Sequence, residues 1–329
     1  MRFVKIIGTG SYTPEKILSN QDFEKMVDTS DEWIRTRTGI VERRIAEPEV
    51  ASSDMAYEAS LKALESASVD PLDVDGIIVG TVTPDYIFPA TSCFVQSRLG
   101  AKNAFAFDLL AGCSGFIYAL QVGKGMIESG DAEIILVIGA ETLSRITDYE
   151  DRSTCILFGD GAGAAVLSKS GVSGILSTYL GANGDEWDKI ILPAGGSRMP
   201  ATEKTVKNRL HYLKMKGNDV FKEGVKSLEY ASLEALKKAD ITTDQISLFI
   251  PHQANHRIMD AARKRLNFSP EKLFVNIDKY GNTSAASAPI ALDEAVKSGR
   301  IQKDDLILFA VMGSGFTCAS AVVRWLEPQ

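Results

Sequence analysis

Short apolar runs separated by polar segments recur along the whole chain, and six of them have the length of buried strands. They are residues 76–80, 104–109, 134–139, 164–167, 246–250 and 306–311. An apolar stretch over residues 116–126 predicts a buried helix, and a second helix is predicted directly after residue 255. The apolar stripe of that second helix consists of Ile258, Met259, Ala262 and Leu266. Strands alternating with helices predict an α/β fold.

Two glycine clusters adjoin the predicted strands. Gly8 and Gly10 follow an apolar start but lack the third glycine and the helix of a dinucleotide-binding fingerprint, so they predict a tight strand exit. Residues 159–163 (GDGAG) precede a strand instead of a helix. This second cluster predicts close packing of the backbone.

The order of these elements repeats once along the chain. Residues 59–64 (ASLKAL) recur as residues 231–236 (ASLEAL), and each copy leads into a strand-like run. A Ser-Gly pair beginning at Ser129 and another at Ser298 precede two further strands in the same order. Both offsets are close to half of the 329 residues, which indicates a duplicated α/β unit. The predicted halves are residues 1–171 and residues 172–329.

Composition limits the possible functions. The formal net charge of −7 argues against a chain devoted to nucleic acid, and the apolar stretches are too short to span a bilayer. Charges interrupt the first strand, so no signal peptide is predicted and we expect a cytoplasmic protein. The four cysteines are far apart and form no C-x-x-C pair, which predicts reduced thiols and no metal site.

Cys113 is the first candidate for chemistry. It lies in a turn of small residues (LAGCSG, 110–115) between a predicted strand and a predicted helix. Backbone amides and the dipole at a helix N-terminus favour a thiolate there, and Gly112 and Gly115 leave room for a substrate carbonyl. An unpaired cysteine is equally compatible with a small buried apolar side chain.

His252 and Asn282 are the second and third candidates. His252 follows the strand-like run at 246–250, and Asn282 lies in a polar segment, although the first could be a core histidine and the second a turn residue. Cys113 precedes its Ser-Gly pair by 16 positions, and Asn282 precedes its own pair by 16 as well. We therefore expect both to occupy equivalent places in the two halves, and all three side chains to meet where strands end.

Six segments, in this order and at these spacings, carry a specific pattern: residues 28–40 (DTSDEWIRTRTGI), 110–115 (LAGCSG), 158–163 (FGDGAG), 251–255 (PHQAN), 281–284 (GNTS) and 315–317 (GFT). Together they resemble the β-ketoacyl-acyl-carrier-protein synthase III family, and the resemblance covers the whole chain. The resemblance implies a thiolase-like fold with two similar α/β halves in five layers, αβαβα, and two mixed β-sheets. It also implies a homodimer in which Phe88 lies near the interface and the partner's primer tunnel.

The resemblance further implies the initiating condensation of type II fatty-acid synthesis. Cys113 would take an acyl group from acyl-CoA, and malonyl-acyl carrier protein would then lose CO2 and attack that acyl group. His252 and Asn282 would stabilise the enolate. The amides of Cys113 and of Ser314, in a loop where the family often has a third glycine, would form the oxyanion hole. No cofactor is implied, because acyl-CoA is a substrate.

Binding residues follow from the same resemblance. Trp33 would stack on the adenine of CoA, Arg37 and Arg152 would flank it, and Asn255 would bond the pantetheine arm. A basic surface would dock the acidic carrier protein. Its predicted members are Lys222, Gln253, Ala254, Asn255, His256, Arg257, Lys264 and Arg265. Cys318 departs from the family, which often has tryptophan there.

Three other readings stay open at this point. Type III polyketide synthases share the Cys-His-Asn set but use free CoA esters and need no basic docking surface. Hydroxymethylglutaryl-CoA synthases need a catalytic glutamate near the cysteine, and we expect none in the loops named above. A scaffold that binds acyl groups without turnover would be compatible with the fold, although intact Cys113, His252 and Asn282 argue against it.

Overall fold

The computed structural model describes residues 2–326 and contains two mixed β-sheets. The first sheet has the order β1-β7-β6-β4-β5, in which β4 is parallel to both neighbours and β7 is antiparallel to both of its own. Its strands are β1 (Phe3–Tyr12), β4 (Gly76–Gly80), β5 (Phe105–Leu109), β6 (Ile134–Glu141) and β7 (Gly161–Ser170).

The second sheet has the order β11-β12-β13-β8, with β11 parallel to β12 and the other pairs antiparallel. Its strands are β8 (Ile175–Ala182), β11 (Leu248–Pro251), β12 (Leu306–Gly313) and β13 (Thr317–Arg324). Two small ribbons pair β2 (Ile17–Ser19) with β3 (Glu42–Arg44), and β9 (Ile190–Ile191) with β10 (Lys214–Met215).

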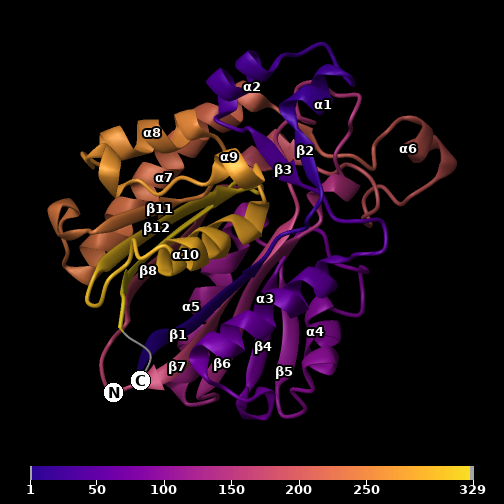
Figure 1. The fold of residues 1–329 in the computed structure, drawn as a ribbon. Helices are drawn as coiled ribbons and strands as arrows, with labels where there is room; N and C mark the ends of the chain where they lie inside the picture. The colour runs from indigo at the N-terminus through magenta and orange to yellow at the C-terminus, as the bar shows by residue number, and fades with distance from the viewer. Residues whose placement is uncertain (1, 327–329) are drawn as a thin grey trace.

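Helices and sheets alternate in five layers, which confirms the predicted αβαβα architecture (Figure 1). Helices α3 (Ser52–Ala67) and α4 (Thr91–Leu99) cover the outer face of the first sheet, and α7 (Gly217–Ala239) with α8 (His256–Arg265) covers the outer side of the second. Between the sheets lie α5 (Gly115–Ser129) and α10 (Ser287–Lys297). The shorter helices are α1 (Asn20–Glu24), α2 (Asp31–Thr38), α6 (Glu203–Lys207) and α9 (Ile277–Tyr280).

The central helices form one core with the inner faces of both sheets. Phe116 and Leu120 of α5 and Leu292 of α10 belong to the same buried cluster as Ile78 of the first sheet and Phe309 of the second. Because helices cover both faces of β4 and β6, these strands are buried almost throughout. Their sequences are therefore continuous apolar runs instead of alternating ones. None of the helices found in residues 2–326 has the length and apolar content that crossing a bilayer requires.

Glycines allow close packing between these layers. A Cβ on Gly163 of β7 would lie 2.7 Å from the backbone nitrogen of Ile290, which confirms the close packing predicted for that cluster. The strand exit predicted at Gly8 and Gly10 is wrong, because β1 continues to Tyr12. These glycines instead let α3 approach the strand, since a Cβ on Gly10 would lie 2.3 Å from the Ala59 carbonyl oxygen.

The strands of the first sheet all precede residue 171 and those of the second all follow residue 172. The division into two equivalent halves nevertheless remains a prediction. The expected equivalence of Cys113 and Asn282 is wrong in register: Cys113 lies inside the 3₁₀ turn η2 (Gly112–Ser114) before α5, whereas Asn282 precedes the turn η7 (Ser284–Ala286) before α10. The equal spacing to the Ser-Gly pairs arises because α5 is longer than α10.

Candidate active site

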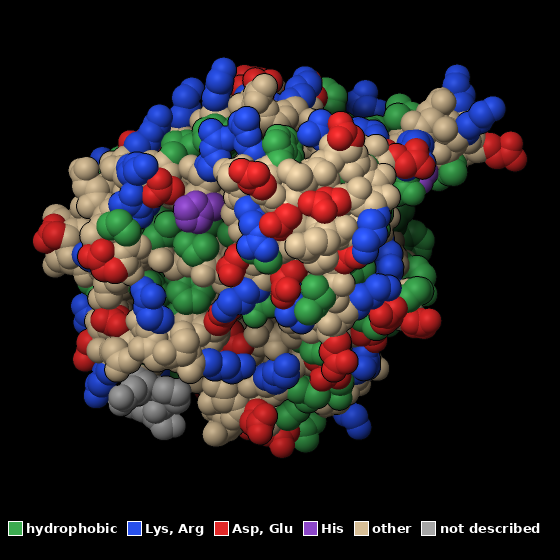
Figure 2. Space-filling view, turned by 45° about the horizontal axis from the view of Figure 1, so that its top comes forward, with side chains coloured by type: hydrophobic (Ala, Val, Ile, Leu, Met, Phe, Trp, Pro, Cys, Tyr) green, Lys and Arg blue, Asp and Glu red, His purple; other side chains and the backbone are tan. Residues whose placement is uncertain are grey.

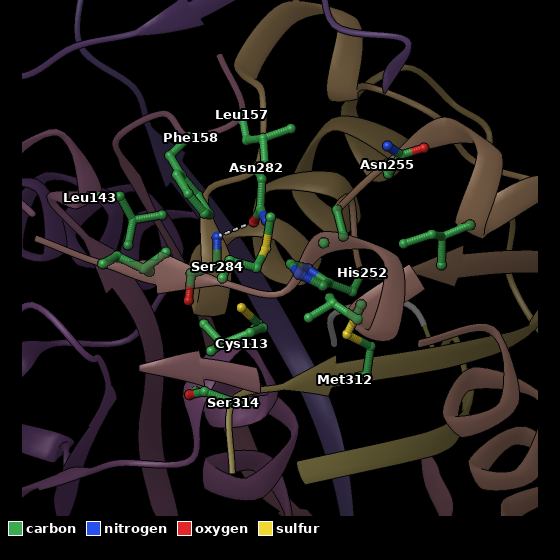
Figure 3. A pocket seen from close by; sticks show the side chains of 18 of the residues that line it. Cys113, Leu143, Leu157, Phe158, His252, Asn255, Asn282, Ser284, Met312 and Ser314 are labelled. Atoms are coloured by element: carbon green, nitrogen blue, oxygen red, sulfur yellow. Dashed lines mark hydrogen bonds between the residues drawn. The ribbon is translucent and has the colours of Figure 1, made fainter. Parts of the chain in front are cut away.

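Cys113, His252 and Asn282 line one cavity of about 120 Å³ between the two sheets' loops. Figure 3 shows the three side chains pointing toward one another from different elements. Ser284 and Ser314 line the same cavity, and its walls are largely apolar. The structure thus brings together the three candidates for chemistry, which are far apart in the sequence.

The turn that carries Cys113 contacts the loop after β12 through the backbone of both. A Cβ on Gly112, whose φ is +58°, would lie 2.6 Å from the Ser314 nitrogen. A Cβ on Gly313 would lie 2.4 Å from the Cys113 nitrogen. Thr317 Oγ1 also donates a hydrogen bond of 2.8 Å to the Ala111 carbonyl. Glycine is required here because only a bare backbone allows the two loops to approach so closely.

Burial controls the charge of the Cys113 thiol. Removal from bulk water raises the pKa of Cys113 to about 12, a neighbouring Ser284 hydroxyl lowers it, and the charge of Glu141 raises it further. This direction is opposite to the one that a helix N-terminus alone predicts. Burial therefore opposes the thiolate that the helix N-terminus favours, because the cavity walls withdraw the sulfur from water.

His252 follows β11 directly, as expected, and is 1% exposed. Its Nδ1 atom lies 2.6 Å from the Ser287 hydroxyl at the start of α10. This contact leaves Nε2 for the cavity. Burial lowers the pKa of His252 to about 3, so the imidazole is neutral. Ser287 was missed by the sequence reading, although a buried histidine requires a partner for its second nitrogen and the segment after Asn282 is rich in hydroxyl groups.

The backbone of Asn282 pairs with the segment containing the FGDGAG motif. Its amide donates to the Leu157 carbonyl at 2.9 Å, and its carbonyl accepts from Gly159 at 3.0 Å. Its side-chain Oδ1 accepts from the Ser284 amide at 2.8 Å, so the NH2 group remains as the donor for the cavity. A Cβ on Gly159 would lie 2.2 Å from the Tyr280 carbonyl oxygen, which explains the glycine at this position.

A buried glutamate lies close to Cys113, although it belongs to strand β6 and to none of the loops in which the sequence predicts no glutamate. Glu141, the last residue of β6, is fully buried and its charge affects the Cys113 thiol. Its carboxylate accepts hydrogen bonds from the Val82 amide at 3.1 Å and from the Ser284 hydroxyl at 2.9 Å. Glu141 is not among the residues that line the cavity, so it does not contact a ligand there. The feature of the sequence that points to Glu141 is a single charged residue at the end of an apolar strand.

The residues predicted to bind CoA lie at the outer part of the site. Trp33 on α2 is 36% exposed, and the Arg152 guanidinium lies over its ring at 5.0 Å from the centroid. Asn255 lines the cavity, but its Nδ2 donates to the Arg37 carbonyl at 3.0 Å and its Oδ1 accepts from the Arg257 amide at 2.8 Å. Asn255 therefore also caps α8 and ties it to α2.

The predicted docking surface needs one correction. Gln253 is 1% exposed, and its side chain bonds the Pro251 and Phe274 carbonyls and the Asn276 amide, so it cannot meet a partner. Ala254 and Asn255 are partly buried. The exposed members are Lys222, His256, Arg257, Lys264 and Arg265. Figure 2 shows many Lys and Arg side chains on the face that includes the α2 and α8 end of the molecule.

Phe88 lies in an exposed apolar segment. Tyr86, Ile87 and Phe88 are 61%, 84% and 83% exposed, far more than apolar side chains of a buried core. A second cavity of about 840 Å³ adjoins Tyr86 and Ile87, and it shares Val82 with the cavity of Cys113. Contiguous exposed apolar residues of this kind are typical of interaction surfaces.

Within residues 2–326, no group of three or more His, Cys, Asp or Glu side chains is placed to hold a metal ion. All four cysteines are free. The polar side chains that line the cavity are those of Cys113, His252, Asn255, Asn282, Ser284 and Ser314.

Two family profiles match the chain. The profile described as 3-Oxoacyl-[acyl-carrier-protein (ACP)] synthase III matches residues 107–184. The profile described as 3-Oxoacyl-[acyl-carrier-protein (ACP)] synthase III C terminal matches residues 236–325. The first contains Cys113 and the second contains His252 and Asn282.

Whole proteins are similar over almost the full chain. The beta-ketoacyl-[acyl-carrier-protein] synthase III of Caldanaerobacter subterraneus subsp. tengcongensis is 58% identical over 322 residues, covering 97% of each chain. The protein of that name from Clostridioides difficile is 50% identical over 320 residues, covering 97% of this chain and 98% of the other. The solved 3-oxoacyl-[acyl-carrier-protein] synthase III of Aquifex aeolicus VF5 has a TM-score of 0.90 at 50% identity, covering 98% of this chain and 100% of that one. The chain therefore belongs to the β-ketoacyl-acyl-carrier-protein synthase III family of condensing acyltransferases, which share a thiolase-like fold.

Proposed function

We propose that this chain transfers an acyl group from acyl-CoA to Cys113 and then condenses it with malonyl-acyl carrier protein to form 3-oxoacyl-acyl carrier protein, CoA and CO2. The observation that carries the proposal is that Cys113, His252 and Asn282 line one cavity. A thiol beside two hydrogen-bond donors suits an acyl transfer followed by attack of an enolate.

In the first half of the reaction, the Cys113 sulfur attacks the thioester carbonyl of acyl-CoA. The new bond joins the acyl carbon to Cys113, the bond from that carbon to the CoA sulfur breaks, and the proton of the Cys113 thiol ends on CoA. Since the pKa of Cys113 is about 12 in the free protein, the thiol stays protonated until the substrate is bound. The amides of Cys113 and Ser314, on the two loops in backbone contact, are the proposed donors to the carbonyl oxygen.

In the second half, the malonyl group loses CO2 and leaves an enolate. The NH2 group of Asn282 and Nε2–H of neutral His252 are the proposed donors to the enolate oxygen. A Ser287 hydroxyl that donates to Nδ1 would keep the proton on Nε2, as this role requires. The enolate carbon then attacks the acyl carbon on Cys113, the bond from that carbon to the Cys113 sulfur breaks, and the released thiolate takes a proton from water to restore the thiol.

We also propose the CoA-binding residues and the carrier-protein partner that the resemblance implies. Trp33, Arg37, Arg152 and Asn255 would bind CoA, and the exposed basic side chains of α7 and α8 would meet an acidic carrier protein. Those basic side chains favour a carrier-protein substrate over the free CoA esters used by type III polyketide synthases. No cofactor is needed, because the side chains in the cavity supply the donors and the nucleophile. A cytoplasmic location fits the four free cysteines.

Replacement of the proposed nucleophile tests the function. Incubation with radiolabelled acetyl-CoA should label the wild-type protein covalently, and Cys113→Ser should abolish that label because an ester would have to form in place of the thioester. Cys93→Ser, at an exposed cysteine, is the matched control and should keep full labelling. Labelling of Cys113→Ser at the wild-type level would contradict the proposal, and so would an unlabelled wild-type protein.

A further inference from the structure

Glu141 is a fully buried carboxylate that the reaction described above does not use. In the part of the chain that the structure describes, no Lys or Arg forms an ion pair with it. A carboxylate without a cationic partner is costly to bury, so its position needs a physical reason. Burial raises the pKa of Glu141 to about 7, and several hydrogen bonds lower it.

The donors to Glu141 come from loops of both sheets. From the loop after β4, the Val82 amide donates at 3.1 Å and the Thr83 hydroxyl donates as well. From the turn before α10, the Ser284 hydroxyl donates at 2.9 Å and the Ala285 amide lies at 3.5 Å. One carboxylate thus joins two loops that are far apart in the sequence, with Cys113 beside it.

These bonds reach the cavity through Ser284. Ser284 has a φ of +49°, a left-handed conformation that is unfavourable for a residue with a side chain, and its hydroxyl is bound to Glu141. The amide of the same residue donates to Asn282 Oδ1 at 2.8 Å. Because Oδ1 is occupied, the NH2 group of Asn282 is the part of the amide left for a ligand. Glu141 thus binds the side chain of the residue whose amide occupies Asn282 Oδ1.

Glu141 has the opposite influence on Cys113. Its charge raises the pKa of that thiol, whereas the Ser284 hydroxyl lowers it. The other titratable group of the cavity, His252, is kept neutral by burial. Removal of the Glu141 charge should therefore make Cys113 easier to ionise and at the same time release the turn that orients Asn282.

We propose that Glu141 is a positioning residue for the decarboxylation half of the reaction: it fixes the Ser284 turn and thereby presents the Asn282 amide N–H to the enolate. This inference rests on the proposed function, and Glu141 itself touches neither substrate. A residue that only stabilised the fold would affect both halves of the reaction alike. Glu141 should affect them in opposite directions.

Glu141→Gln is the first test, because it keeps the shape and removes the charge. Decarboxylation of malonyl-acyl carrier protein without primer should fall by about 10-fold or more, since a lost donor to an oxyanion costs roughly 10²-fold or more. The midpoint pH for alkylation of Cys113 by iodoacetamide, followed by intact mass, should move down. Equal losses of decarboxylation and of self-acylation, or an unchanged alkylation midpoint, would overturn the proposal.

Asp293→Asn is the matched control. Asp293 is also a buried carboxylate joining distant segments, since it accepts from Thr9 Oγ1 at 3.0 Å and from Ser11 Oγ at 2.5 Å and pairs with Lys297 at 2.8 Å, but unlike Glu141 it has no partner there that lines the cavity. Asp293→Asn should leave the alkylation midpoint and the ratio of the two half-reactions unchanged. A shift as large as that of Glu141→Gln would make the Glu141 effect a general consequence of losing a buried charge and would overturn the proposal.

Ser284→Ala keeps the proposal testable even where Glu141→Gln fails to fold. This variant removes the link but keeps the charge, so decarboxylation should again fall while the Cys113 alkylation midpoint moves up instead of down. A downward movement or unimpaired decarboxylation would contradict the inference. The alkylation experiments need no substrate. They therefore still test the contact between Glu141 and Ser284 if the labelling experiment contradicts the proposed function.

Discussion

The charge states of single residues in the cavity are governed by burial. Burial raises the pKa of Cys113 to about 12 and lowers that of His252 to about 3, so both side chains are neutral near pH 7. Glu141, with a pKa raised to about 7, changes its charge in the range where enzymes are assayed. Of these three groups, the one whose pKa lies nearest to 7 is thus a carboxylate that does not line the cavity.

The Glu141 pKa gives a prediction for stability. Its folded-state pKa of about 7 exceeds its ordinary value of 4.5, so the protonated form is favoured by folding and its contribution is lost as the pH rises through about 7. The free energy of unfolding of the wild type, relative to Glu141→Gln, should fall between about pH 4.5 and pH 7 by on the order of 3 kcal/mol. Urea unfolding of both proteins across this range measures it. A difference that stays constant or grows with pH would contradict the assignment.

Some single residues could be predicted from the sequence and others could not. Cys113 and His252 could be predicted because each is a reactive side chain directly after a strand-like run, and Asn282 because it precedes a Ser-Gly pair by the same 16 positions as Cys113. Ser287 and Glu141 act only through contacts with distant residues, and pattern alone does not reveal such contacts. Gln253 was misplaced on the surface because nothing in its local sequence indicates that three backbone groups bind its amide.

At the scale of elements, α8 has two different faces. Its apolar stripe, including Ile258, Met259 and Ala262, is buried as predicted. Its outer face carries Arg257, whose guanidinium lies over the Phe221 ring of α7, and Lys264, which is paired with Asp260. Arg257 is exposed and next to the site, so it is the basic residue best placed to meet a carrier protein near the cavity.

Charge reversal on α8 tests the docking surface. Arg257→Glu should raise the KM for malonyl-acyl carrier protein by about 10-fold and leave labelling by acetyl-CoA unchanged, because charge complementarity acts only on the acidic partner. Steady-state kinetics at low and high salt measure the effect, which should shrink at high salt. Lys102→Glu, at an exposed lysine in the loop before β5, is the control of equal charge change. An equal loss in both variants would exclude a local docking surface.

The boundaries of the strands show where the hydrophobic pattern predicts the structure correctly and where it does not. Strands covered on both faces, such as β4 and β6, are uninterrupted apolar runs and were predicted within a few residues. β1 was predicted to end too early because its glycines resembled a turn, whereas they make room for α3. The register between the two halves was wrong because a count along the chain does not reveal that α5 and α10 differ in length.

At the scale of the whole molecule, the exposed apolar segment around Phe88 is the feature that a single chain leaves unexplained. It adjoins the larger cavity, which shares Val82 with the cavity of Cys113. A second copy of the chain that covered this segment would also close that cavity. The homodimer that the family implies stays a proposal, and burial of this exposed apolar segment is the physical reason for it.

Disruption of this surface tests the homodimer. Phe88→Asp should lower the mass in solution from about twice 35.6 kDa toward 35.6 kDa, because a buried charge without a partner strongly destabilises an interface. Light scattering after gel filtration measures the mass. Val172→Asp, in the exposed turn between β7 and β8, should leave it unchanged. A wild-type protein that is already monomeric, or a dimer unaffected by Phe88→Asp, would refute this interface.

The layered architecture followed from the repeat and from the resemblance, but the pairing of strands did not. No pattern in the sequence states that β4 lies between β5 and β6, since this order depends on how helices cross the sheet. The same holds for the meeting of Gly112 with Ser314, which exists only in the folded chain.

That meeting restricts how the enzyme can move. Main chain rests on main chain at Gly112 and again at Gly313, without side chains that could slide or rotate between them. The Cys113 turn and the Ser314 loop are therefore packed together through their backbones, which fixes the Cys113 and Ser314 amides relative to each other. Ile190, Leu213 and Met215, in and beside β9 and β10, line the same cavity from outside that contact, so a larger or smaller side chain there would change the space for a ligand without moving either amide.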